Sequence, residues 1–253
     1  MHKTKDILNI TLLPFITFLT AVFLWQLADF IFNIKEVILP NPLEISNQII
    51  NNFFILLDNT GITMLESFCG FIIGSISAVS IAILFTYSSN SKKALYPYAI
   101  ALKATPLYAL APILVMWFGN GIMSKIVMSS LVAFFPVLVG AVKGFTSVEQ
   151  EQIDLFRSFS ASRWQIFKKL RFPSSLPYIF PALKIATTLA VVGSTIAEFT
   201  GSSKGIGHLI VNSSYYLETS LMFSGIIFIS LAGVFFFYLV NLIEKKIVFW
   251  QTI

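Results

Sequence analysis

The sequence predicts an all-α protein that crosses a membrane several times, and composition, charge and block length support this fold class. Hydrophobic residues make up 56% of the 253 residues and only 11% are charged, whereas water-soluble domains carry about 25% charged residues. The apolar residues come in blocks of roughly 20 or more, enough for a helix to cross about 30 Å of hydrocarbon. A helix also pairs its backbone groups internally, as a segment in lipid must.

Six apolar blocks are expected to form the transmembrane helices of this polytopic protein. The first is too long for the apolar part of a signal peptide and has no clear cleavage site, so it is expected to remain as an anchor. The third contains Pro106 and Pro112, which would kink its helix. The expected spans cover residues 9–33, 62–87, 95–118, 122–143, 178–198 and 220–243.

The distribution of lysine and arginine predicts the orientation of these spans. Twelve of the seventeen basic residues fall on one side of the spans and three on the other. Because cytoplasmic loops carry the excess of Lys and Arg, both termini are expected in the cytoplasm. The expected parts are an N-terminal helix with an outer interfacial helix (1–60), a core (61–243) with a cytoplasmic loop at 148–177, and a cytoplasmic tail (244–253).

The outer interfacial helix is predicted just after the first span. Asn41 and Glu44 have the spacing of a capping box, and Pro42 suits the first helical turn. An apolar stripe then begins at Ile45 and recurs along one face. This pattern is typical of a helix that lies in the membrane interface.

The cytoplasmic loop is charged but regularly patterned, and it predicts two short amphipathic helices. The first carries Ile153, Phe156 and Phe159 at intervals of three, which places them on one helical face. The small residues 160–162 then interrupt the pattern and predict a corner. The loop therefore begins with a helix that ends at a close turn.

The second loop helix is predicted from a cap and a second apolar stripe. Ser162 and Gln165 have capping-box spacing, and Trp164 begins another set of apolar residues three apart. Pro173 is expected to end this helix. The pattern leaves three roles open: an interfacial pair on lipid headgroups, packing against the protein's own spans, or docking into a cytosolic partner.

The stretch 148–186, VEQEQIDLFRSFSASRWQIFKKLRFPSSLPYIFPALKIA, resembles the cytoplasmic EAA loop of permease subunits in bacterial ATP-binding-cassette importers. The likeness is to the branch that carries nitrate, sulfonates, taurine and thiamine- or riboflavin-related compounds. Leu155 and Phe156 replace two small residues of the motif, and Ser160 replaces its usual glycine. The matching residues are Asp154, Arg157, Ala161, Ser162, Arg163, Trp164, Leu176 and Pro177.

Four further stretches resemble the same family, in the same order along the chain. LPNPL (39–43) is similar to its Leu-Pro-Ser-Pro segment, and GFIIG (70–74) falls in the second span. KATPLYALAPILVMWFGNGIMSKI (103–126) is similar to its proline-rich third span and Trp-Phe-Gly turn. AEFTGSSKGIGHLI (197–210) is similar to the segment after its fifth span.

The resemblance implies a type I importer permease in the bacterial inner membrane. In such importers the loop seats in a groove of a separate ATPase, and closure of two ATPases moves two permeases between inward- and outward-open states. The implied partners are an ATPase dimer, a second permease copy, an extracytoplasmic solute-binding protein and the lipid bilayer, without nucleic acid. The residues expected to bear the coupling are Glu149, Asp154, Leu155, Phe156, Arg157, Ser160, Ala161, Ser162, Arg163 and Trp164.

No cofactor, metal or catalysis is expected on this chain itself. The sequence lacks the GxxxxGK[ST] loop that holds nucleotide phosphates, and GSSKGIG (201–207) has the wrong spacing for it. His2 and His208 are too far apart in sequence to suggest a metal cluster. ATP is therefore expected to be used by the partner subunit, and this chain is not expected to be an enzyme.

Four charged residues within the spans are candidates for the translocation path or gate. Lys103 and Lys184 lie near the cytoplasmic boundary, where a lysine either lines the path or extends to lipid headgroups. Glu66 either lines the path, or is an interfacial carboxylate or the partner of a base in another helix. Glu198 either meets the solute or its binding protein at the outer gate, or is a solvated helix end.

Two functions are compatible with the residues alone. The first is the permease subunit of an ATP-driven importer, and the alternative is a stand-alone secondary carrier or channel whose inner loop lies on lipid. The resemblance favours the importer. It also favours a thiamine pyrimidine precursor or a riboflavin-like compound as the solute, with a sulfonate, taurine or nitrate as alternatives.

Overall fold

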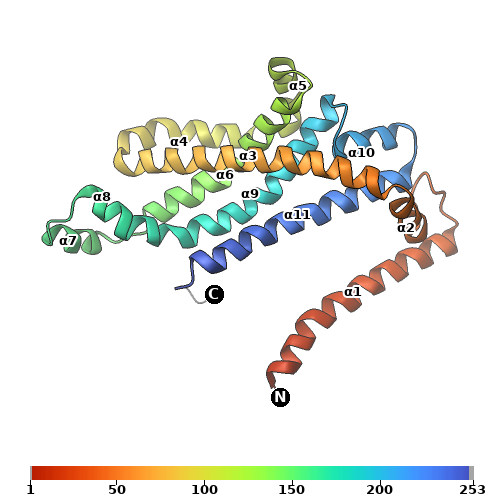
Figure 1. Ribbon diagram of the computed structural model, residues 1–253, viewed down its shortest axis with the longest axis horizontal. Helices are drawn as coiled ribbons and strands as arrows, with labels where there is room; N and C mark the ends of the chain where they lie inside the picture. The colour runs from red at the N-terminus through yellow and green to blue at the C-terminus, as the bar shows by residue number, and fades with distance from the viewer. Residues whose placement is uncertain (1, 251–253) are drawn as a thin grey trace. The chain divides into compact units, whose positions relative to one another are not determined.

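The computed structural model describes the backbone of residues 2–250 and the side chains of 12–250, except residues 89, 99, 100, 102–104 and 107 (Figure 1). The described chain is helical and contains no strand, which confirms the predicted fold class. The helices are α1 (His2–Phe32), α2 (Pro42–Asn51), α3 (Phe53–Tyr87), α4 (Ser89–Ala104), α5 (Leu107–Phe118), α6 (Ile122–Phe145), α7 (Gln150–Ser158), α8 (Arg163–Ile166), a π-helical turn (Phe167–Arg171), α9 (Phe172–Gly201), α10 (Ile206–Tyr215) and α11 (Thr219–Ile247).

Five helical stretches in the described part of the chain are long and apolar enough to cross a membrane. The third predicted span, 95–118, is not one continuous helix, because α4 ends at Ala104 and α5 begins at Leu107. Pro106 disfavours the helical conformation at Thr105 and offers no N–H to continue the ladder. Pro106 instead stands at the N-cap of α5 in an extended conformation (φ −60°, ψ 122°).

The prediction that Pro173 ends the second loop helix is wrong. The chain stays helical from Arg163 to Gly201. A π-helical turn precedes the proline, and the N–H of Phe172 reaches back five residues to the carbonyl of Phe167. This wider turn inserts one extra residue before Pro173, which then lies in the first turn of α9, where its missing N–H costs little.

The chain divides into two compact units, and the smaller contains residues 1–57 and 209–227. Its helix α2 begins with the predicted capping box. The N–H of Glu44 donates to Asn41 Oδ1 and the N–H of Asn41 donates to Glu44 Oε2, both at 2.9 Å. Ser220 Oγ also donates to Glu36 Oε1 at 2.7 Å, which ties the start of α11 to the segment after α1.

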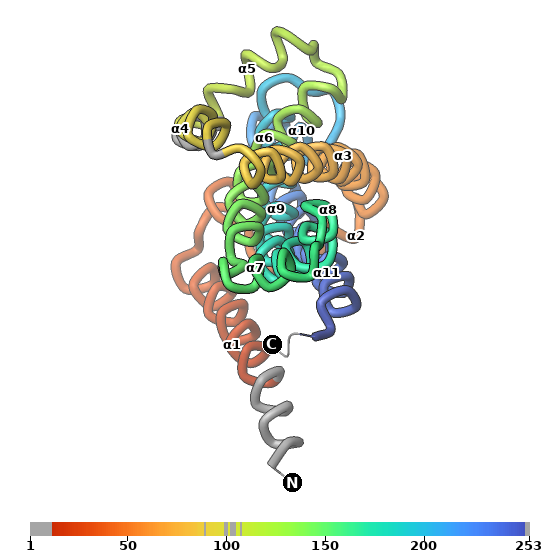
Figure 2. Tube along the Cα trace, turned by 90° about the vertical axis from the view of Figure 1, so that its left-hand side faces the viewer, coloured from red at the N-terminus to blue at the C-terminus, as the bar shows by residue number. Residues whose placement is uncertain are grey.

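The larger unit contains residues 58–208 and 228–253, and α6 and α9 run side by side through it (Figures 1 and 2). Glycines bring their backbones together. A Cβ on Gly144 would lie 2.8 Å from the carbonyl oxygen of Ser175, and one on Gly193 would lie 3.0 Å from Ser129 Cα. Small residues at helix contacts are what packing in lipid requires, because there is no hydrophobic driving force between spans.

Candidate functional site

The α7–α8 loop, defined here as residues 149–166, turns back on itself through a left-handed residue. Ser160 has φ +57° and follows the last turn of α7. Its N–H donates to the carbonyl of Arg157 at 2.8 Å, and the N–H of Ala161 donates to that of Phe156 at 3.1 Å. This pair of bonds is a Schellman motif, which satisfies the final carbonyls of a helix and favours glycine at the left-handed position.

The predicted cap of the second loop helix is present. The N–H of Gln165 donates to Ser162 Oγ at 3.2 Å, and the N–H of Ser162 donates to Gln165 Oε1 at 2.7 Å. The corner between the two helices is thus closed on both sides by hydrogen bonds. Local residues define its geometry.

The loop presents a row of exposed apolar side chains on a buried root. Leu155, Phe159 and Trp164 are 57%, 78% and 65% exposed. Phe167 is buried, and its ring centroid lies 5.7 Å from that of Trp164 and 5.6 Å from that of Phe145. Trp164 is therefore anchored through Phe167 to the end of α6.

The predicted apolar face of α7 is only partly formed. Ile153 is buried and Phe156 is half-buried, but Phe159 is exposed. Because α7 ends at Ser158, Phe159 leaves the helical register and does not share the face of Ile153. The loop therefore directs more apolar surface outward than its periodicity indicates.

Two hollows flank this loop. One of about 330 Å³ is lined by apolar groups that include Leu155 and Phe159 together with the corner residue Ala161. The other, of about 410 Å³, is polar, and the guanidinium groups of Arg157, Arg163 and Arg171 are among its walls.

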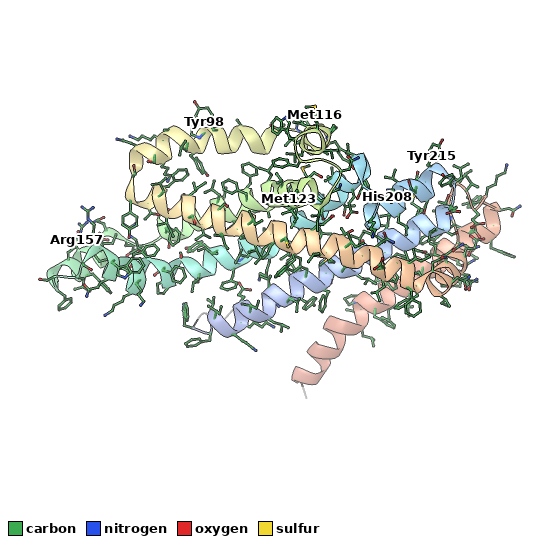
Figure 3. The ribbon with its side chains drawn as sticks, turned by 45° about the horizontal axis from the view of Figure 1, so that its top comes forward. Tyr98, Met116, Met123, Arg157, His208 and Tyr215 are labelled. Carbon is green, nitrogen blue, oxygen red and sulfur yellow. The ribbon has the colours of Figure 1, made fainter. Side chains whose placement is uncertain are left out.

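Charged groups on α7 project from the loop. Figure 3 shows Arg157 there, and its guanidinium lies 3.0 Å from the Asp154 carboxylate. Both side chains are mostly exposed, so this ion pair contributes at most about 1 kcal/mol. The coupling residues predicted from the sequence all lie in this one loop, including the exposed Glu149 at the N-cap of α7.

The four candidates for the path or gate lie in different surroundings. The side chain of Lys103 falls outside the described residues. Lys184 Nζ lies 2.5 Å from Glu244 Oε2 and 3.5 Å from Asn241 Oδ1, so α9 and α11 are joined by a largely buried ion pair. Glu66 and Glu198 are brought together in the buried polar cluster, defined as these two glutamates with Thr63 and Lys125.

Glu198 lies at the N-terminus of α10 and binds it. Its Oε2 accepts the N–H of Gly207 at 2.6 Å, and its Oε1 accepts the Thr63 hydroxyl at 2.6 Å. Thr63 Oγ1 accepts the N–H of Ile206 at 2.9 Å, and Asn59 Oδ1 accepts that of Gly205 at 3.0 Å. The N–H groups at the start of α10, which have no partner in the helix, are thus satisfied by side chains of α3 and α9.

The glycines of GSSKGIG make room for this carboxylate. Gly205 has φ +101°, and a Cβ there would overlap the Glu198 carboxylate. A Cβ on Gly207 would lie 2.7 Å from Glu198 Oε2. The glycine-rich stretch therefore holds an internal carboxylate instead of a phosphate.

Lys125 supplies the positive charge of the cluster, and the sequence analysis did not identify it. It is fully buried in the first turn of α6. Its Nζ donates to the carbonyls of Asn120 at 2.5 Å and of Gly201, the last residue of α9, at 2.7 Å. A cation at the C-terminus of a helix is favourable. The one sequence signal for Lys125 is its place in the first turn of an otherwise apolar span.

Two larger hollows lie beside α9. One of about 510 Å³ is lined by apolar residues that include Leu131, Phe135 and Ile185. The other, of about 530 Å³, is bordered by aliphatic side chains together with two aromatic rings and the hydroxyls of two threonines and a serine. No described residue that lines either hollow is charged. The aromatic and hydroxyl side chains of the second hollow are Tyr108, Phe199, Thr188, Thr195 and Ser230.

Within the described residues, no group of three histidine, cysteine, aspartate or glutamate side chains could hold a metal ion.

Comparisons with known proteins agree on one family. The family described as "Binding-protein-dependent transport system inner membrane component" matches residues 70–249. The chain is 32% identical to a "Probable ABC transporter permease protein" of Haemophilus influenzae, over 81% of this chain and 83% of that protein. It is 27% identical to the "Formylaminopyrimidine transport permease protein ThiX" of Halalkalibacterium halodurans, over 94% of this chain and 95% of that protein.

A solved structure shares the fold. A chain of the MetNI methionine ABC transporter, in an inward facing conformation, superposes with a TM-score of 0.68. The match covers 77% of this chain and 97% of that chain, at 15% sequence identity.

Proposed function

This chain belongs to the family of inner-membrane components of binding-protein-dependent transport systems, and from that membership we propose that its α7–α8 loop couples solute movement to a separate ATPase. The chain is a multi-pass permease of the inner membrane and not an enzyme, since ATP is hydrolysed by a separate subunit in these systems. A stand-alone carrier has no support from these relatives.

The observation that carries the proposal is the exposed apolar row on the loop. Leu155, Phe159 and Trp164 are exposed although they are large and apolar, and they stand on a structured corner. Exposed apolar groups in a rigid arrangement are typical of a helix that docks into a groove. The small Ala161 between the two helices allows a partner's backbone to approach closely.

The loop is placed in the cytoplasm in this proposal, with both termini on the same side. The excess of basic residues on this side of the spans supports that orientation. The ATPase supplies ATP binding, so this chain needs no cofactor of its own. We further propose that two copies of the chain form the permease and that a solute-binding protein approaches the opposite face.

For the solute, the proposal is a small, uncharged, flat heteroaromatic compound of the aminopyrimidine type. The hollow of about 530 Å³ offers the rings of Tyr108 and Phe199 for stacking and hydroxyls for hydrogen bonds. A sulfonate or nitrate would require a cation, and none of the described lining residues provides one. The name of the relative from Halalkalibacterium halodurans points to the same solute class.

The coupling proposal is tested with the double variant Arg157→Glu/Ala161→Glu. We expect loss of co-purification with the cognate ATPase and loss of ATP-driven uptake in proteoliposomes, with an unchanged melting temperature. Both substituted positions lie on the loop surface, and neither contributes a buried side chain. The matched control is Lys245→Glu, an exposed charge reversal near the end of α11, which should leave assembly intact.

The proposal fails if the double variant still assembles with the ATPase and transports at the wild-type rate. The solute class is tested separately, by calorimetric titration of the purified binding protein with formylaminopyrimidine and with taurine. Tight binding of taurine alone would overturn the heteroaromatic proposal and leave the coupling proposal standing.

A further inference from the structure

The buried polar cluster holds two acidic side chains and one cation in a place that water does not reach. Glu66 and Glu198 are 3% and 1% exposed, and Lys125 is fully buried. If both glutamates were ionised, the cluster would carry one uncompensated negative charge within the spans. Removing such a charge from water costs several kcal/mol, so the structure must compensate for it.

The hydrogen bonds distinguish the two glutamates. Both oxygens of Glu198 accept a hydrogen bond, one from Thr63 and one from the backbone of Gly207. Among the described residues, no donor reaches Oε2 of Glu66, although this atom is buried. Glu66 nevertheless lies against Glu198, because contacts between α3 and α9 flank it on both sides: Thr63 binds Glu198 at 2.6 Å, and the Ser67 hydroxyl lies 2.6 Å from that of Ser194.

An ionised carboxylate only accepts hydrogen bonds, whereas a protonated one also donates. Two ionised carboxylates in contact would repel each other, but a carboxylic acid beside a carboxylate forms a strong hydrogen bond. Thr63 and Gly207 donate to Glu198, and Lys125 donates to two backbone carbonyls, so the proton belongs on Glu66. The cluster then contains a neutral Glu66, an anionic Glu198 and a cationic Lys125, and its net charge is zero.

We propose that Glu66 and Glu198 form a proton-binding site, in which one proton is carried by Glu66 and donated to Glu198, and that this proton is required for the packed arrangement of α3, α6, α9 and the start of α10. The site does not depend on the coupling proposal. It predicts that the packed arrangement is weakened in alkaline solution, because the packed state holds a proton that a hydrated, separated pair of glutamates releases at neutral pH.

The charged and titratable groups around the site come from four elements. Helix α3 contributes Glu66, α6 contributes Lys125, and α9 contributes Glu198. In the first turn of α10, the half-buried His208 follows Gly207 (Figure 3). A His208→Gln variant serves to separate the contribution of this imidazole from that of the two glutamates.

The first experiment is infrared spectroscopy of the full chain in lipid nanodiscs at neutral pH, with difference spectra taken between H₂O and D₂O. These spectra report the carbonyl stretch of protonated carboxylic acids. We expect a band in the wild type that is lost in Glu66→Gln and kept in Glu151→Gln, an exposed glutamate on α7. Absence of the band in the wild type, or its persistence in Glu66→Gln, overturns the proposal.

The second experiment compares melting temperatures from mildly acidic to mildly alkaline pH. The wild type and His208→Gln should lose roughly 3–6 °C over this range, whereas Glu66→Gln, which keeps a donor towards Glu198, should show no such loss. Glu198→Gln should melt below the wild type throughout. A wild type without pH dependence, or a Glu66→Gln variant that keeps it, contradicts the proposal. Neither readout involves ATPase, binding protein or solute.

Discussion

The α7–α8 loop is held by hydrogen bonds between residues at most five positions apart, whereas the buried polar cluster joins residues up to 135 positions apart. The loop exposes its large apolar side chains, and the cluster encloses charged ones. The exposed side chains of the loop can therefore be substituted without loss of its backbone conformation, because local backbone hydrogen bonds define its corner. The cluster is more constrained, since Thr63, Glu198 and Lys125 each bind a partner on another helix.

The largest effect should follow from Glu198→Ala in the cluster. This change removes the acceptor of the Gly207 N–H and of the Thr63 hydroxyl. Breaking a buried charged network costs about 3–5 kcal/mol, so the melting temperature in nanodiscs should fall sharply or the chain should not fold. The control Glu151→Ala, on exposed α7, should lie within about 0.5 kcal/mol of wild type. Equal effects of both variants would remove the distinction between the two regions.

A smaller effect is expected for Gly207→Ala. Its Cβ would lie 2.7 Å from Glu198 Oε2, and overpacking of this kind costs about 1–3 kcal/mol. The control Gly121→Ala places a Cβ where no other heavy atom lies within 4 Å, so its melting temperature should match that of wild type. If Gly207→Ala melts like Gly121→Ala, the carboxylate does not occupy the space assigned to it.

The smallest effect is expected in the loop, and it should be stabilising. Ser160→Gly relieves a left-handed conformation that costs a non-glycine residue about 1 kcal/mol. The amides of the corner should therefore exchange hydrogen more slowly, with no measurable change in the global melting temperature. Ser158→Gly, in the last turn of α7, should instead speed local exchange. Faster exchange in Ser160→Gly would contradict the strain assigned to this corner.

The sequence predicted those parts of the fold that depend on neighbours along the chain. Hydropathy located the long spans, and the capping boxes at Asn41 and Ser162 were found from residues three positions apart. The break at Thr105 and the π-helical turn before Pro173 were missed. A proline predicts a disturbance of the helix, but the surrounding turns decide whether the helix stops, as before Pro106, or continues, as through Pro173.

The buried polar cluster could not be assembled from the sequence, although Glu66 and Glu198 were both singled out. Thr63 and Glu198 are 135 positions apart, and the meeting of their helices is set by tertiary packing. Lys125 follows a tight turn, so it resembled a basic residue at the membrane surface. Its burial depends on the two carbonyls that the ends of other elements place around it.

The helical stretch from Arg163 to Gly201 runs without interruption for 39 residues, about 58 Å at the usual helical rise. One end bears the exposed Trp164, and the other bears Glu198. No flexible linker separates them. A force applied at the Trp164 indole would therefore tilt or twist the whole helical stretch instead of deforming a loop. The wide turn at Phe167–Arg171, where the backbone ladder changes its step, is the place where such a stretch would yield first.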